Sequence, residues 1–92
     1  MKKPNINYSW KIALDSVTRN IYGLDKIDQP LRDEIKFALD QIDKDEWFPF
    51  ARNLLDRRPG ISSINLANEA ASEFLNHKFN TSNLRVEFGE NT

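Results

Sequence analysis

The sequence predicts a mainly α-helical fold, a compact bundle of about four short helices with a small β-strand or hairpin near the C-terminus. Three observations predict it. Apolar residues recur at steps of three and four over most of the chain, which is the spacing of one face of an α-helix. Near the C-terminus this spacing changes to alternation, as in a strand. The 92 residues have room for one hydrophobic core, so we expect a single domain over residues 1–92.

The first helix is expected over residues 9–22. Its apolar positions follow helical steps and are Trp10, Leu14, Val17 and Ile21. Gly23 is expected to end or loosen this helix, since glycine has a low helix propensity.

The second helix is expected over residues 29–43. Asp28 is placed to cap its free backbone N–H groups, and Pro30 falls in the first turn, where proline costs no hydrogen bond. The apolar stripe of this helix is Leu31, Ile35, Ala38, Leu39 and Ile42. Phe37 lies off the stripe, so it either packs against a second neighbour or remains exposed.

Two further helices are expected on either side of Pro59-Gly60. The third covers residues 49–57 and stops before this pair, because the residue preceding a proline disfavours helix. The fourth covers residues 62–77, with Ser62 or Ser63 as its N-cap. Its expected buried residues are Ile64, Ala67, Ala70, Ala71, Phe74 and Leu75. Its expected water-facing residues are Asn65, Asn68, Glu69, Ser72, Glu73 and Asn76.

A strand is expected over residues 84–88, where apolar and charged side chains alternate. A strand needs a partner, and three are open: a hairpin with Lys78-Phe79, the segment of residues 5–8, or the same strand of a second copy in a homodimer. A small sheet within one chain is favoured.

Composition restricts the location of the protein and its chemistry. Charged residues make up 29% of the chain and apolar residues 39%, as in ordinary globular domains. No apolar run approaches the roughly 20 residues that cross a bilayer, and the N-terminal residues do not form a secretion signal. We therefore expect a cytoplasmic protein without a membrane partner. The absence of cysteine removes disulfides and thiolate chemistry.

No pattern of residues indicates a catalytic centre, a metal or a cofactor, so we expect a protein without enzymatic activity. His77 is the single histidine and has no cysteine with which to share a metal. A calcium loop that began at Asp43 would need glycine at its sixth position and glutamate at its twelfth, where Phe48 and Leu54 stand. The three glycines are isolated, so no phosphate-binding loop is present.

An acidic run that leads into an aromatic cluster is the best candidate for a functional site. The formal net charge is −1, but residues 1–20 are net basic and residues 21–46 net acidic. Large aromatic side chains anchor interfaces, and neighbouring charges steer a partner of opposite charge. The candidate partner-binding residues are Asp43, Asp45, Glu46, Trp47 and Phe48. The alternative for each is a solvated helix face or a place in the core.

The function expected from these residues is the occlusion of a partner protein with a basic surface. Inhibitors, immunity proteins and antitoxins act in this way, and the comparison with them rests on size and composition alone.

A nucleic-acid-binding protein is the alternative hypothesis. The third and fourth helices flank a turn, as in a helix-turn-helix motif, and the C-terminal strand would form a wing. The residues available for contacts are Arg57, Arg58, Asn65 and Asn68. Because phosphate contacts supply most of the affinity for nucleic acid, this sparse set of basic residues ranks the hypothesis second.

Overall fold

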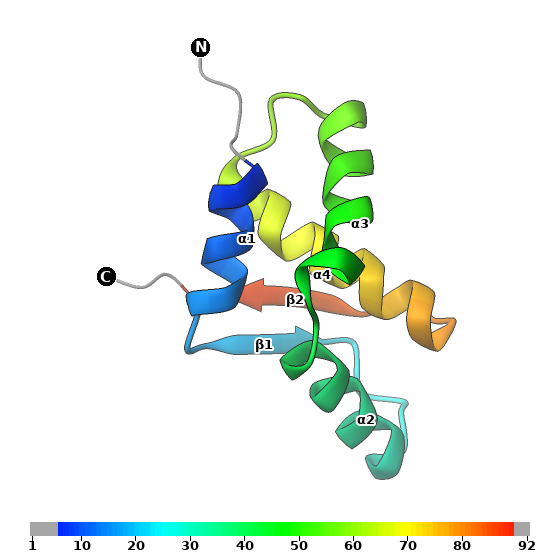
Figure 1. The fold of residues 1–92 in the computed structure, drawn as a ribbon. Helices are drawn as coiled ribbons and strands as arrows, with labels where there is room; N and C mark the ends of the chain where they lie inside the picture. Colours follow the sequence, from blue (N-terminus) through cyan, green and yellow to red (C-terminus); the bar gives the residue numbers. More distant parts are fainter. Residues whose placement is uncertain (1–5, 90–92) are drawn as a thin grey trace.

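The computed structural model describes residues 6–89, which form four helices and one two-stranded antiparallel sheet (Figure 1). The elements are α1 (Ile6–Asp15), β1 (Arg19–Tyr22), α2 (Gln29–Asp40), α3 (Lys44–Arg57), α4 (Ser63–Phe79) and β2 (Arg85–Phe88). The expected mainly α-helical class with a C-terminal strand is confirmed. Lys2 and Lys3, which contribute to the basic N-terminal segment, lie outside the described residues.

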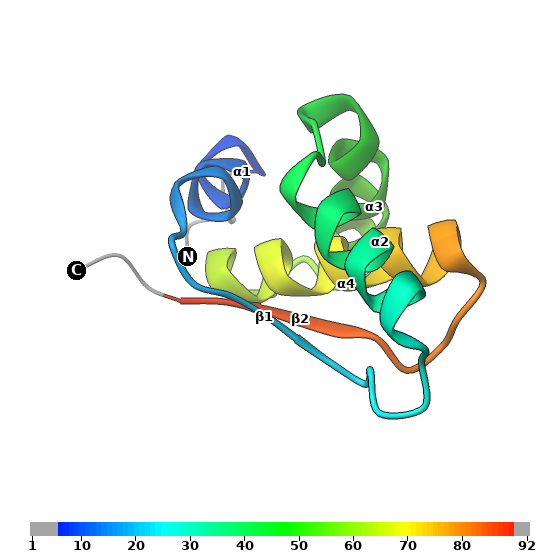
Figure 2. The same cartoon turned by 90° about the horizontal axis from the view of Figure 1, so that it is seen from below.

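Helix α4 lies at the centre of the fold and contacts α1, α2, α3 and β2. Helices α1 and α3 cover one side of α4, and the sheet covers the other side (Figure 2). The expected buried stripe of α4 is correct except at Ile64, which is partly buried. Leu66 was missing from that stripe and is fully buried. A helix surrounded on several sides needs a wider apolar face than a surface helix.

The first predicted helix is wrong over its second half. Helix α1 ends at Asp15, and residues 19–22 form β1. The Ser16 hydroxyl lies within hydrogen-bonding distance of the carbonyl oxygens of Thr18 (2.7 Å) and Gly89 (3.0 Å), which fixes the turn between the two elements. The Arg19 guanidinium then donates to the C-terminal carbonyl oxygens of α1, at 3.4 Å from Ala13 and 3.2 Å from Leu14. These contacts satisfy groups that every helix C-terminus leaves free.

Gly23 follows β1 and does not end a helix. Its φ of +94° lies in the region that glycine adopts without strain. A Cβ atom at this position would lie 2.1 Å from the carbonyl oxygen of Asn83. The glycine therefore allows the two chain segments beside the sheet to pass in contact.

Strand β2 pairs with β1, which was not among the three expected partners. The register joins Arg19 to Phe88 and Tyr22 to Arg85. Lys78-Phe79 is the end of α4, and Ile6–Tyr8 belong to α1; Asn5 lies outside the described residues. The sheet therefore forms within one chain.

Helix α4 supplies hydrogen bonds to the other edge of β2. The amides of Leu84, Val86 and Phe88 donate to Asn76 Oδ1 (3.0 Å), Ser72 Oγ (2.7 Å) and Asn68 Oδ1 (2.9 Å) respectively. Asn68, Ser72 and Asn76 recur every four residues and so share one face of the helix. The prediction that these three side chains face water is therefore wrong. Because these side chains occupy the edge, β2 has no free edge for a homodimer through the C-terminal strand.

The boundaries of the other helices follow from their caps. Helix α2 ends at Asp40, not at residue 43, and Asp28 precedes it without a side-chain cap bond. Helix α3 begins at Lys44, not at residue 49, because Asp43 Oδ1 accepts the Glu46 N–H at 2.9 Å. Pro49 lies inside α3, in its second turn.

Helix α4 begins and ends with its own caps. Ser62 is the N-cap, as one of the two expected serines, and its Oγ accepts the Asn65 N–H at 3.3 Å. The helix continues to Phe79, two residues beyond the expected end, and Asn80 closes it with a φ of 53°. Asparagine adopts this left-handed conformation more readily than most residues.

Candidate protein-binding site

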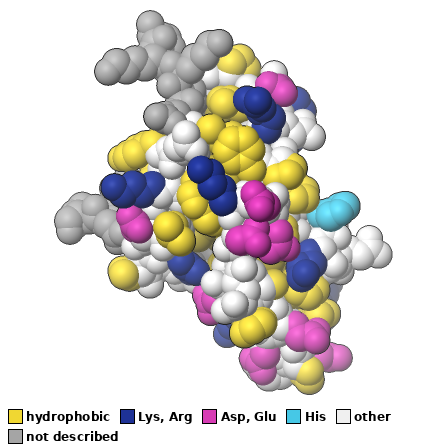
Figure 3. Space-filling view, viewed as in Figure 1, with side chains coloured by type: hydrophobic (Ala, Val, Ile, Leu, Met, Phe, Trp, Pro, Cys, Tyr) yellow, Lys and Arg dark blue, Asp and Glu magenta, His cyan; other side chains and the backbone are white. Residues whose placement is uncertain are grey.

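Acidic and hydrophobic side chains lie side by side over the junction of α2 and α3 (Figure 3). This is the region in which the sequence places the partner-binding residues. Asp43, Asp45 and Glu46 are all exposed there. Asp43 caps α3, and the other two carboxylates lie in its first turn, where the helix dipole favours negative charge. These three residues thus help to start α3, whatever else they contact.

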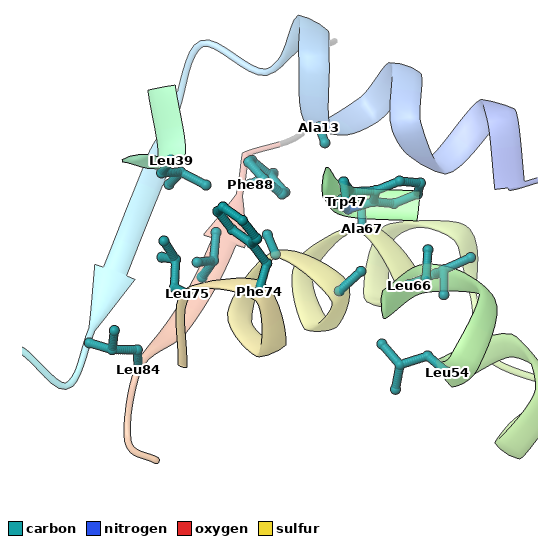
Figure 4. Packing of buried hydrophobic residues seen from close by; sticks show 14 of the residues in the cluster. Ala13, Leu39, Trp47, Leu54, Leu66, Ala67, Phe74, Leu75, Leu84 and Phe88 are labelled. Atoms are coloured by element: carbon teal, nitrogen blue, oxygen red, sulfur yellow. The ribbon is translucent and has the colours of Figure 1, made fainter. Parts of the chain in front are cut away.

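Trp47 is a core residue. Its exposed fraction is 0%, and its ring centroid lies 5.3 Å from that of Trp10. Figure 4 shows the indole against Ala67 of α4. No described residue accepts a hydrogen bond from its Nε1. The sequence-based hypothesis of a surface anchor does not hold for this tryptophan, because burial removes it from any partner.

The other aromatic residues of the cluster are half-buried. The ring of Phe48 lies 6.4 Å from that of Trp47, and Lys44 Nζ lies 5.9 Å from the Phe48 ring centroid. Phe50 packs edge-on against Phe74, with 6.1 Å between the centroids. The cluster therefore closes the core, and it leaves Phe48 partly accessible beside a cation.

A hollow of about 320 Å³ opens between α2, the start of α3 and the end of α4. Its lining residues are Glu34, Phe37, Ala38, Gln41, Glu46, Phe74, Lys78 and Phe79. Glu46 is the one predicted site residue that reaches this hollow. The sequence left open whether Phe37 packs against a second neighbour or remains exposed. The ring is 65% exposed, so the second alternative is correct.

The charges around the hollow are mostly unpaired. No ion pair among the described residues involves Glu34, Glu46 or Lys78. Asp40, in contrast, lies 3.4 Å from the Arg19 guanidinium. The hollow thus combines an apolar floor, an exposed aromatic ring, one lysine and two carboxylates, and the two carboxylates leave it with an excess of negative charge. Such a hollow is complementary to a ligand that carries an apolar group beside a positive charge.

The contacts of the third and fourth helices weigh against the helix-turn-helix hypothesis. The Arg57 guanidinium lies 3.0 Å from Glu73 Oε2, and Arg58 is paired with Glu69. Asn68 accepts the Phe88 amide and is not free to read a base. A recognition helix needs one face in the groove of DNA, whereas α4 is covered by its neighbours.

Other classes of site and the comparisons with known proteins give no further lead. Within residues 6–89, no group of three or more potential ligand side chains could hold a metal ion. None of the helices described there has both the length and the apolar character of a membrane span. Searches against protein-family models, curated proteins and solved structures found no match.

Proposed function

We propose that this chain is a non-enzymatic protein-binding module that acts by occluding a surface of a partner protein, as inhibitors, immunity proteins and antitoxins do. The single observation that supports this proposal most is Phe37, a large aromatic side chain that stands 65% exposed at the edge of the hollow. Interfaces concentrate their binding energy in a few such anchors. The binding surface proposed here is therefore the hollow, and it replaces Trp47 by Phe37 as the aromatic anchor.

The two glutamates define the kind of partner. Glu34 and Glu46 line the same hollow as Phe37 and have no ion-pair partner among the described residues. A lysine or arginine of the partner would pair with them, while an apolar side chain beside it fills the space next to Phe74. The partner proposed is thus a protein with a basic and apolar patch.

A capture experiment with matched baits tests the proposal. The wild-type chain, Phe37→Ala and Tyr8→Ala are each immobilised and exposed to an extract of the native host, with and without nuclease. Tyr8 is a suitable control because it is also a large aromatic residue, 57% exposed, and lies on α1 away from the residues that line the hollow. Neither truncation should unfold the chain, since both side chains are largely in solvent.

The expected result is a protein that both wild type and Tyr8→Ala retain in the presence of nuclease and that Phe37→Ala loses. With the purified partner, Phe37→Ala should weaken binding by about 2 kcal/mol, or roughly thirtyfold in Kd. Equal retention on all three baits would contradict the assignment of the hollow. Recovery that disappears with nuclease would favour the nucleic-acid hypothesis instead.

A further inference from the structure

The two edges of the sheet differ in how their backbone groups are satisfied. The Gly89 N–H donates to the Thr18 carbonyl, so the backbone groups of Thr18 point toward β2. Along a strand, the backbone groups of successive residues point to alternate edges. The N–H and C=O groups of Asn20 and Tyr22 therefore also point toward β2. The N–H and C=O groups of Arg19 and Ile21 therefore point to the opposite edge. Residues 6–89 contain no third strand to receive them.

Helix α4 closes the edge of β2 with side chains, but no described element does so for β1. Asn68, Ser72 and Asn76 receive the outward amides of β2. No described side chain or loop accepts a hydrogen bond from the Arg19 or Ile21 amide. An edge of this kind is a template for another strand unless proline, a bulge or unpaired charge protects it.

Strand β1 is short, with four residues, which limits the area of any pairing, but it has none of these three protective features. Its sequence is Arg-Asn-Ile-Tyr, without proline. Arg19 is its one charged residue, and Asp40 of the same chain lies 3.4 Å from the Arg19 guanidinium. Two copies of this strand can therefore approach each other without a net repulsion between like charges.

We propose that β1 pairs with β1 of a second copy of this chain, antiparallel and about a two-fold axis at Asn20, so that the two sheets join into one. In this arrangement Arg19 of each copy exchanges backbone hydrogen bonds with Ile21 of the other copy. Asn20 faces its symmetry mate as a pair without backbone hydrogen bonds between them. The same register brings Val17, which is 89% exposed, beside the Tyr22–Gly23 end of the other copy.

Cysteine cross-linking tests the register directly, because the native chain contains no cysteine. In Asn20→Cys the two thiols face each other, with Cα atoms about 4.5 Å apart as in other pairs of this kind, which a disulfide can bridge. In Tyr22→Cys, the matched control on the same strand, the symmetry-related Cα atoms are about 13 Å apart. Both residues are exposed, and circular dichroism establishes that each variant is folded.

The expected result is that mild oxidation converts Asn20→Cys to a covalent dimer at least about tenfold faster than Tyr22→Cys, because pairing raises the effective concentration of the facing thiols. Equal rates for the two variants would overturn the proposal.

The wild-type chain supplies a second test that does not depend on a variant. An interface built on so short a strand is small, so the sedimentation coefficient should rise between about 10 µM and about 1 mM protein. Over the same range, hydrogen exchange should slow at the Arg19 and Ile21 amides and stay constant at Asn20 and Tyr22. A constant sedimentation coefficient, or a dimer without added protection at Arg19 and Ile21, would also overturn the proposal.

Discussion

Trp47 and Phe37 show how burial assigns different roles to aromatic residues in neighbouring helices. Trp47 is fully buried against Trp10, so Trp47→Ala should lower the free energy of unfolding by about 3–5 kcal/mol. Trp47→Phe should cost less than Trp47→Ala, since it also removes an indole N–H that has no described acceptor. Denaturant unfolding monitored by circular dichroism measures both changes. A loss below about 1 kcal/mol for the alanine variant would show that Trp47 does not hold the core.

Gly23 allows a second prediction at the scale of one residue. Gly23→Ala should destabilise the fold by more than about 1 kcal/mol, because the added Cβ would lie 2.1 Å from the Asn83 oxygen at a φ of +94°. Gly60→Ala is the matched control, since a Cβ there has no neighbour within 4 Å. The control should change the stability by no more than about 0.5 kcal/mol. Similar melting temperatures for the two variants would contradict this account of Gly23.

At the scale of elements, the packing of β2 against α4 depends on hydrogen bonds from polar side chains as well as on apolar contacts. Ser72 is buried, and its Oγ accepts the Val86 amide at 2.7 Å. Ser72→Ala leaves this amide without its acceptor and should cost about 1–3 kcal/mol. Ser82→Ala, at an exposed serine, should cost little. Faster hydrogen exchange at Val86 would accompany the loss in Ser72→Ala, and unchanged exchange there would contradict the proposed role of the serine.

The elements also differ in how far the sequence predicts them. The strand over residues 84–88 follows from its alternation and is observed as Arg85–Phe88. Strand β1 was missed because its apolar residue Ile21 also fits a helical step, and its partner is remote in sequence. A helix forms through contacts between residues three and four positions apart, which a short sequence window contains. The pairing of two strands that are distant in sequence leaves no such pattern in the window.

The same reasoning explains what could be predicted of the site. The position of Phe37 off its apolar stripe was a local signal, and its exposure agrees with that signal. The start of α3 could also have been found, because Asp43 and Glu46 have the spacing of a capping box. The hollow could not have been found from the sequence, because it exists only where α2 packs beside the end of α4. Trp47 was misplaced because neighbouring aromatic residues do not reveal which of them points inward.

At the scale of the whole molecule, α2 is attached less extensively than the other helices. It contacts mainly α4, and an exposed ion pair between Asp40 and Arg19 adds little. Amides of α4 and β2 should therefore exchange hydrogen only on global unfolding, whereas those of α2 should exchange through a local opening of lower free energy. Native-state hydrogen exchange at increasing denaturant concentration measures both free energies. One common value for α2 and α4 would show that the fold opens as a single unit.

This difference gives a readout of binding that does not depend on the identity of the partner. The hollow is lined by α2 together with the ends of α3 and α4, so a ligand seated in it binds the closed form and not the form with α2 detached. Binding should then raise the opening free energy of α2 by about 2.7 kcal/mol at a ligand concentration of 100 Kd. The free energy of global unfolding, which the amides of α4 report, should rise by the same amount, because the unfolded chain also lacks the hollow. A ligand that protects another element and leaves the exchange of α2 unchanged would bind elsewhere, and the assignment of Phe37 as the anchor would be wrong.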